Sequence, residues 1–365
     1  MEKNRLFAGR EKIMKILIPL IFFGKGGGFR VLSNLASNWM NMGHVVDFIT
    51  TTEDKPYFPT KANILLINKK GDITNTPSSY RHTLFRLLAI FHYIRKNKNK
   101  YDVILANFNQ TLPLSFFAAR KKLFYYVQAY EVEFWNNIGI HNKLCRLFAY
   151  ISYKIPVIRI GNAEIYRKYK SLKCKYIVPP GLDLDLYYPK ERVLWDKTTP
   201  LIVGCIGRKE PWKGSSDVAN AVQILRNRGY NIHFRVAFNK VENVEHELVF
   251  PDGDKNLADY YRSLNILVAP GKIQLGAVHY PVIEAMACRT IVVNTGYYPS
   301  NDENSYIVAV SSPKDIADKI ENIINDYEKA LNKADKAFSE LAESAWPVVS
   351  KKFIDIFNKE LNFKS

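Results

Sequence analysis

Residues 14–51 read MKILIPLIFFGKGGGFRVLSNLASNWMNMGHVVDFITT. The stretch opens with an apolar run, Ile16–Phe23, and continues into a glycine-rich loop, Gly24–Gly28. Phe29–Met42 then place apolar residues at helical spacing, and Val45–Thr51 form a second apolar run. Strand, loop, helix and strand in this order predict a βαβ unit, and therefore a parallel sheet.

The same alternation continues along the rest of the chain. Further strands are predicted at Ile64–Ile67, Val103–Asn107, Leu123–Gln128, Val157–Ile160, Leu201–Ile206, Ile232–Ala237, Ile266–Ala269 and Thr290–Asn294. Residues 178–189, VPPGLDLDLYYP, interrupt the pattern with prolines and a glycine. The sequence therefore predicts an α/β protein of two Rossmann-like, doubly wound domains that face each other across a cleft.

The expected domains are residues 1–185, a basic acceptor-side domain, and residues 186–345, a donor-binding domain. Residues 346–365 are expected to form a helix that packs back against the first domain. Trp346-Pro347 is expected to kink the helical C-terminal stretch, because proline removes a backbone donor.

The formal net charge of +17 is unevenly distributed. Residues 1–189 hold 29 Lys and Arg against 12 Asp and Glu, whereas residues 190–365 hold 23 of each. Such a field attracts phosphate-bearing partners. An anionic membrane surface, a solvated lysine-rich surface and nucleic acid are the three explanations. Two basic stretches with helical apolar spacing, Arg81–Lys96 and Asn142–Lys154, favour the membrane, although a core-facing helix with a solvated basic face has the same pattern.

The cysteines indicate a reducing compartment. Cys145, Cys174, Cys205 and Cys288 are far apart and lack metal-ligand spacing.

The apolar run Ile16–Phe23 contains proline and leads into glycines, which favours a buried strand over a signal peptide. No stretch is long enough to span a bilayer. Two Asp-x-Asp triplets, at residues 183–185 and 252–254, lie in turn-prone segments and are expected to be solvated turns rather than a metal site.

Two segments of the second half carry the chemistry. Residues 207–214, GRKEPWKG, follow a predicted strand, and so does the segment that contains Glu284 at the start of a predicted helix, Val282–Ala287. Arg208 and Lys213 suit a diphosphate, because the arginine fork holds two oxygens and the lysine adds a point charge. Ribose hydroxyls suit the carboxylate of Glu284.

These segments resemble the donor half of the retaining glycosyltransferase family 4, a class with the GT-B fold. The resemblance rests on Gly207-Arg208 with Lys213-Gly214 and on Glu284-Ala285-Met286-Ala287-Cys288. It extends to the first half through Met14–Phe23, Gly26–Gly28 and Arg30-Val31-Leu32, and to the linker through Gly181-Leu182-Asp183 and Tyr188-Pro189. Nearly the whole chain is covered.

The resemblance implies roles for individual residues. Arg208 and Lys213 would neutralise the donor diphosphate and the leaving nucleoside diphosphate. The two side chains would thereby perform the task that a metal ion has in other enzymes. Glu284 would hold the ribose, while Gly27 and Gly28 would approach donor and acceptor closely. Donor-binding roles are also expected for His279, Tyr280 and Pro281.

The chain departs from the family pattern at two positions. Gly276 stands where the family carries a second glutamate that contacts the transferred sugar, and Arg289 stands where a glycine is usual. Tyr280-Pro281 before Glu284, together with Gln128, Tyr130 and Glu131 after a strand, resemble rhamnosyltransferases of surface-polysaccharide assembly. Gln128, Tyr130 and Glu131 are therefore expected on the acceptor side, where Glu131 could orient a hydroxyl or stabilise charge on the sugar.

The sequence thus predicts a metal-independent hexosyltransferase that moves a sugar from a UDP-, dTDP- or GDP-linked donor to a lipid-linked glycan in bacterial surface-polysaccharide assembly. Its expected location is the cytoplasm, peripheral at the inner face of the cytoplasmic membrane. The protein is expected to need no cofactor and to bind no nucleic acid. The alternatives are a catalytically inactive homologue that acts as a scaffold and a basic nucleic-acid-binding protein, although the chain has no groove-reading or base-stacking motif.

Overall fold

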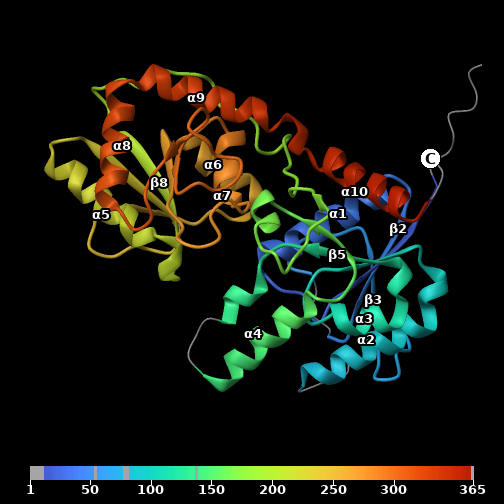
Figure 1. The fold of residues 1–365 in the computed structure, drawn as a ribbon. Coiled ribbons are helices and arrows are strands. Elements are labelled where there is room, and N and C mark those ends of the chain that lie inside the picture. Colours follow the sequence, from blue (N-terminus) through green and yellow to red (C-terminus); the bar gives the residue numbers. More distant parts are fainter. Residues whose placement is uncertain (1–11, 53–55, 77–81, 136–138, 363–365) are drawn as a thin grey trace, which may run out of the picture. The chain divides into compact units, whose positions relative to one another are not determined.

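The computed structural model describes residues 12–52, 56–76, 82–135 and 139–362. The chain divides into two compact units, Met1–Gly181 with Trp346–Ser365 (unit 1) and Leu182–Ala345 (unit 2). Each unit is a parallel sheet covered by helices (Figure 1). The predicted α/β class of two doubly wound domains is confirmed.

The sheet of unit 1 has the strand order β3-β2-β1-β4-β5-β6-β7, and every pairing is parallel. Its strands are β1 Lys15–Pro19, β2 Val45–Thr50, β3 Asn63–Leu66, β4 Val103–Ala106, β5 Leu123–Val127, β6 Ile158–Gly161 and β7 Tyr176–Ile177. Its α-helices are α1 Gly27–Asn41, α2 Thr83–Asn97, α3 Leu112–Ala119, α4 Ile140–Ser152 and α10 Trp346–Glu360. Arg81, the expected start of the α2 stretch, lies outside the described residues.

The sheet of unit 2 has the order β10-β9-β8-β11-β12-β13 and is also parallel throughout. Its strands are β8 Leu201–Gly207, β9 Ile232–Phe238, β10 Glu247–Val249, β11 Ile266–Ala269, β12 Ile291–Asn294 and β13 Tyr306–Ile307. Its helices are α5 Ser215–Asn227, α6 Gly253–Ser263, α7 Tyr280–Ala287, α8 Pro313–Asn325 and α9 Tyr327–Glu340.

Helix α10 packs on the core of unit 1. The Trp39 ring of α1 meets Phe353 and Phe357 at centroid distances of 5.8 and 5.9 Å. The Trp39 indole N–H also donates to the Ser350 carbonyl oxygen at 3.0 Å. The expected kink at Trp346-Pro347 is wrong: α10 begins there. Proline is tolerated in the first turn of a helix, where its missing N–H has no intrahelical partner.

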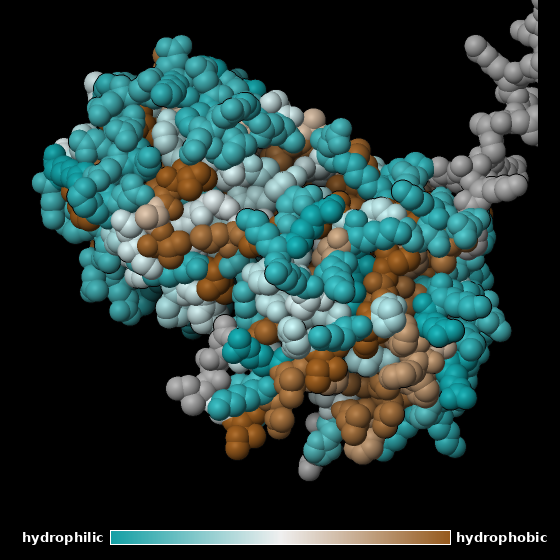
Figure 2. Space-filling view, in the orientation of Figure 1, coloured by the Kyte–Doolittle hydropathy of each residue, from teal (hydrophilic) through white to brown (hydrophobic). Residues whose placement is uncertain are grey.

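Large apolar side chains are exposed on the surface of unit 1 over helices α2, α3 and α4. Figure 2 shows hydrophobic surface over α4 and over the region of α2 and α3. The exposed residues there include Leu84, Phe85, Phe117, Phe134, Ile140, Leu144, Leu147, Phe148 and Ile151. None of the helices in the described residues is long and apolar enough to cross a bilayer.

Candidate functional site

The cationic loop of unit 2 follows the first strand of its sheet. Strand β8 ends at Gly207, Arg208 comes next, and a 3-10 turn, Pro211–Lys213, leads through Gly214 into α5. A Cβ at Gly207 would lie 1.7 Å from one backbone carbonyl oxygen, and a Cβ at Gly214 would lie 2.3 Å from another. Gly214 also has a φ of +77°, which glycine adopts without steric cost. These two glycines let the loop pack directly on neighbouring backbone.

Arg208 and Lys213 line the same small cavity, together with Ser215, His279 and residues from the ends of β8 and β11. The strand order of the sheet reverses between β8 and β11, and ligands of open α/β sheets bind outside the strand ends at such a switch point. The Ser215 hydroxyl accepts a hydrogen bond from the Arg208 N–H at 3.0 Å. The start of α5 therefore fixes the backbone that carries the arginine.

Within the part of the chain that the structure describes, the two cations are not held by an ion pair. The charged neighbours of Lys213 are Arg208 and Glu210, and no carboxylate among the described residues lies within ion-pair distance of either cation. Burial lowers the pKa of Lys213, and the nearby Arg208 lowers it further, although Glu210 opposes both effects. Arg208 and Lys213 are two neighbouring positive charges that repel each other in a partly desolvated cavity. A ligand with two negative charges would neutralise both, so the cavity favours a dianion.

His279 stands at the entrance of α7 and faces these cations. Its ring stacks on Tyr297 at a centroid distance of 4.6 Å and an interplanar angle of 23°. Burial lowers its pKa to about 3, and the charges of Lys213 and Arg208 contribute. The imidazole is therefore neutral, and its Nδ1 is buried without a hydrogen-bond partner in the described part of the chain.

Glu284 lies in the second turn of α7 rather than at its start, because the helix begins at Tyr280. Pro281 follows in the first turn and lines the cavity with the two cations. The Glu284 side chain is 1% exposed, and the Tyr261 hydroxyl donates to its carboxylate at 2.9 Å. The structure thus gives this carboxylate a tyrosine partner from α6.

The segment between β11 and α7 carries the first departure from the family pattern. Gly276 has a φ of +87°, and its N–H donates to the Gly296 carbonyl oxygen at 2.8 Å. The Tyr297 hydroxyl donates to the Ile273 carbonyl oxygen at 2.9 Å. The loop after β12 therefore holds the loop that leads to His279, and position 276 brings no carboxylate to it.

Arg289, the second departure, keeps the backbone conformation expected of a glycine. Its φ is +56°, in the left-handed region. The guanidinium pairs with Asp335 at 2.9 Å and donates to the Lys190 carbonyl oxygen at 3.3 Å. The arginine thus contacts the linker and α9, and it does not line the cavity that contains Arg208 and Lys213.

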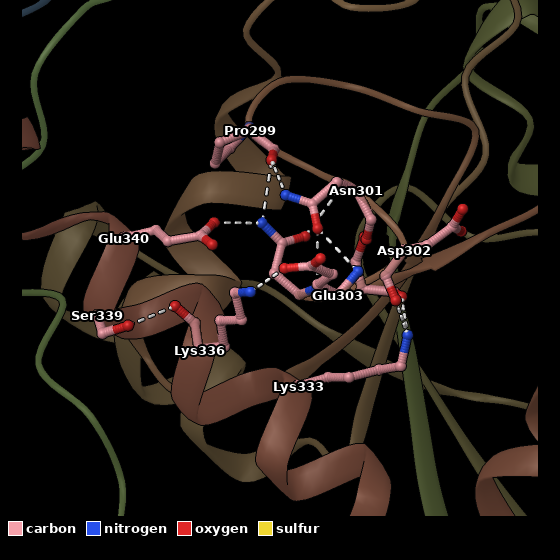
Figure 3. A network of polar contacts seen from close by, with 10 residues as sticks. Pro299, Asn301, Asp302, Glu303, Lys333, Lys336, Ser339 and Glu340 are labelled. Atoms are coloured by element: carbon pink, nitrogen blue, oxygen red, sulfur yellow. Dashed lines mark hydrogen bonds and ion pairs between the residues drawn. The ribbon is translucent and has the colours of Figure 1, made fainter.

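A polar network anchors the loop after β12 to α9 (Figure 3). The Asn304 amide donates to the Pro299 carbonyl oxygen at 3.0 Å and to Glu340 at 2.6 Å. Lys333 donates to the Ser305 carbonyl oxygen at 3.0 Å, and Lys336 pairs with Glu303. Because this loop supports the His279 segment through Gly296 and Tyr297, the network stabilises one wall of the site.

Unit 1 has a cavity of about 300 Å³ at the carboxyl ends of β1, β4 and β5. Its lining residues are mostly apolar: Pro19, Leu20, Ile21, Phe22, Gly26, Gly28, Phe29, Asn107, Phe108, Thr111, Gln128, Ala129, Glu131 and Phe134. The strand order reverses between β1 and β4, so this cavity also occupies a position where open sheets bind ligands.

Two of the predicted acceptor-side residues and one predicted glycine line this cavity. The Gln128 amide donates to the Gly28 carbonyl oxygen at 3.3 Å, which joins the end of β5 to the first turn of α1. Gly27 is exposed at the start of the same helix. Tyr130 is instead packed between Tyr153 and Tyr169, at centroid distances of 5.7 and 4.0 Å, and does not line the cavity.

Glu131 is a buried carboxyl with a full set of donors. The Tyr125 and Tyr153 hydroxyls donate to Oε2 at 2.7 and 2.9 Å, and the Asn109 N–H donates to Oε1 at 3.0 Å. Burial raises the pKa of Glu131 to about 7, although these hydrogen bonds oppose the shift. The side chain therefore holds the loop after β4 in place and changes its charge near neutral pH.

Several lining residues had no signal in the sequence. Asn107, Phe108 and Thr111 follow β4, and Ser215 opens α5, but single polar residues after a strand are common.

The two Asp-x-Asp triplets lie in a turn and at a helix start. Asp183 accepts backbone hydrogen bonds within a turn, and Asp252 lies next to the start of α6. No three His, Cys, Asp or Glu side chains of the described ranges are placed to hold a metal ion. All four cysteines are free thiols.

The sequence and the fold were compared with those of known proteins. Residues 200–326 match the model of the family described as glycosyl transferases group 1. No curated protein matches the chain significantly. Among solved structures, the Anabaena protein Alr3699/HepE, determined with UDP and glucose, has a TM-score of 0.69 at 14% identity, over 95% of this chain and 100% of that one.

Two other solved structures are similar over their whole length. Sucrose-phosphate synthase from Thermosynechococcus elongatus has a TM-score of 0.71 at 15% identity and covers 96% of this chain and 100% of its own. A glycosyltransferase from Rickettsia africae has a TM-score of 0.69 at 12% identity, over 97% and 100%. Residues 200–326 thus match the group 1 glycosyltransferase family model, and the chain as a whole has the fold of the GT-B glycosyltransferases.

Proposed function

We propose that the chain is a retaining, metal-independent hexosyltransferase of the family 4 type, which transfers a sugar from a UDP-, dTDP- or GDP-linked donor to a lipid-linked glycan. The proposed process is bacterial surface-polysaccharide assembly, with rhamnosyltransferases as the nearest kind of enzyme. The proposed location is the cytoplasm, at the inner face of the cytoplasmic membrane, and no nucleic acid is involved.

One observation carries the donor part of this proposal. Arg208 and Lys213 line one cavity at the switch point of the unit 2 sheet and have no ion-pair partner in the described residues. Burial lowers the pKa of Lys213 most, and repulsion by Arg208 lowers it further. A diphosphate would satisfy both cations and relieve this repulsion. As the sugar leaves, the same two charges would stabilise the nucleoside diphosphate, the task that a metal performs in other enzymes.

Features of unit 1 support the acceptor part. The 300 Å³ cavity at the carboxyl ends of β1, β4 and β5 is mostly apolar, with Gln128 and Glu131 as its polar groups at the end of β5. A small number of polar groups in an apolar cavity suits an acceptor that combines hydroxyls with a lipid. Unit 1 also holds 33 Lys and Arg against 12 Asp and Glu, which suits the diphosphate of a lipid-linked glycan and an anionic membrane.

The test is turnover of nucleotide sugars by the full chain. The proposal predicts release of a nucleoside diphosphate from one of the UDP-, dTDP- or GDP-sugars, faster with a bacterial lipid extract and unaffected by EDTA. Arg208→Ala and Lys213→Ala should each lower turnover on the order of 10²-fold. Lys209→Ala is the matched control, because Lys209 is an exposed cation of the same loop that does not line the cavity.

Normal turnover by the Arg208 and Lys213 variants would reject the site assignment, and loss of turnover with EDTA would reject metal independence. Binding of nucleotide sugars without any turnover would instead favour the inactive homologue. One observation favours that second candidate: Gly276 provides no carboxylate at the position where the family contacts the transferred sugar.

A further inference from the structure

Helix α4 presents its apolar side chains away from the core of unit 1. Ile140, Leu144, Leu147, Phe148 and Ile151 recur at helical spacing and are 44–79% exposed. The buried residues of the helix are the small Ala149 and Ser152. An amphipathic helix of a globular protein normally has the opposite orientation, with its large apolar residues inside.

The α-helices of this region carry cations and no acidic residue, and the half-buried carboxylate of Glu133, in the 3-10 helix before α4, accepts a hydrogen bond from the Tyr169 hydroxyl at 2.9 Å. Helices α2, α3 and α4 contain no Asp or Glu. Lys143, Arg146 and Lys154 are exposed in or next to α4, and Lys154 lies 5.3 Å from the centroid of the Tyr150 ring. A protein partner is usually met by both signs of charge, whereas a helix that combines apolar residues with cations and has no acid of its own suits an anionic lipid surface.

The same face belongs to the region that surrounds the cavity of unit 1. The 3-10 helix Glu131–Trp135 precedes α4 and packs against it. Phe134, half of whose side chain is exposed, lines that cavity. Phe117, on α3, is among the most exposed apolar residues of the unit. Figure 2 shows the hydrophobic surface that results.

We propose that α4 docks unit 1 on an anionic membrane by inserting the face Ile140–Leu144–Leu147–Phe148–Ile151 between the lipid headgroups, with Lys143, Arg146 and Lys154 at the phosphates. Cationic side chains of this length reach the headgroup level while their stems remain apolar. The docking deepens the proposed function, since it would bring the acceptor cavity to the surface that carries a lipid-linked glycan. Binding to lipid does not itself depend on turnover.

Sedimentation of the full chain with lipid vesicles tests the docking. We expect binding to vesicles of equal parts phosphatidylglycerol and phosphatidylcholine, and on the order of tenfold weaker binding to phosphatidylcholine alone. Phe148→Glu should weaken binding to the anionic vesicles about tenfold or more. Phe250→Glu is the matched control, because Phe250 is a 70% exposed phenylalanine of unit 2, and it should bind like the wild type.

Two further measurements keep the inference open to rejection. Lys143→Ala with Arg146→Ala leaves the apolar face intact and should weaken binding to the anionic vesicles several-fold. Equal binding of the Phe148 and Phe250 variants would overturn the proposal, and so would a wild-type dimer without lipid that Phe148→Glu dissociates in sedimentation velocity. Lipid binding without turnover would reject the proposed function and leave the docking intact.

Discussion

The His279 imidazole stacks on the Tyr297 ring at 4.6 Å, on the loop that the Figure 3 network ties to α9. The stack leaves Nδ1 buried and without a partner in the described chain, beside Arg208 and Lys213. A buried polar atom of this kind is costly unless a ligand or water satisfies it. The position of the ring thus prepares a hydrogen bond for a ligand that the two cations attract.

The first prediction concerns this nitrogen. His279→Phe preserves the stack on Tyr297 but removes Nδ1, so affinity for a nucleoside diphosphate or its sugar should fall about five- to tenfold while the melting temperature stays the same or rises. Titration calorimetry measures the affinity. His279→Asn should recover part of it. Unchanged affinity of the phenylalanine variant would mean that His279 only packs.

Lys213 gives a pH dependence of binding. Burial and the Arg208 charge lower the pKa of Lys213 below 10.5, so the ammonium loses its proton earlier than an ordinary lysine as the pH rises. Affinity for UDP should therefore fall through that pKa. Lys213→Arg should show no such fall up to about pH 10, because arginine stays protonated. Parallel pH profiles for the two proteins would contradict the role of Lys213.

Glu131 gives a pH dependence of stability. Its pKa is raised from 4.5 to about 7 in the folded state. Between these two pH values the folded protein therefore holds a proton on Glu131 that the unfolded chain has lost. Its contribution to the free energy of unfolding is therefore largest below pH 4.5 and declines as the pH rises to about 7. Relative to Glu131→Gln, the wild type should lose about 3 kcal/mol over this range. Urea unfolding measures it, and parallel curves would contradict it.

A pair of glycines tests how tightly the cationic loop is packed. Gly214 and Gly229 both have positive φ, but only at Gly214 does a Cβ meet another atom within 4 Å. Gly229→Ala should cost about 1–2 kcal/mol from backbone strain alone. Gly214→Ala should cost more than that and should also weaken UDP binding. Equal losses in urea unfolding would show that the loop has room to move.

The sequence predicts the sheets well because local signals coincide there. Apolar runs such as Leu201–Ile206 match β8, and Gly214 marks the turn into α5. Both glycine and apolar runs act within a few residues of their own position, so they can be read without the fold. The positions of Arg208 and Lys213 beyond the carboxyl end of a strand follow from the same signals.

Other features depend on contacts between distant residues. Nothing near Glu131 indicates that Tyr153 will donate to its carboxylate, and nothing near Glu284 indicates Tyr261. The periodicity of α4 predicts an amphipathic helix but not which way it faces, and only the packing of Ala149 and Ser152 decides that its apolar side is outside. Trp346-Pro347 fits both a kink and a helix start, because proline is accepted in a first turn.

Calorimetric titration of UDP, GDP and dTDP into the wild type, Arg208→Ala and Lys209→Ala tests the central claim most directly. The account predicts that at least one nucleoside diphosphate binds the wild type and Lys209→Ala alike, and that Arg208→Ala loses about 1.5–3 kcal/mol of binding free energy, the value of a hydrogen bond to a charged group. Equal binding by all three proteins would contradict it, because the diphosphate would then bind elsewhere than in the cavity of Arg208 and Lys213.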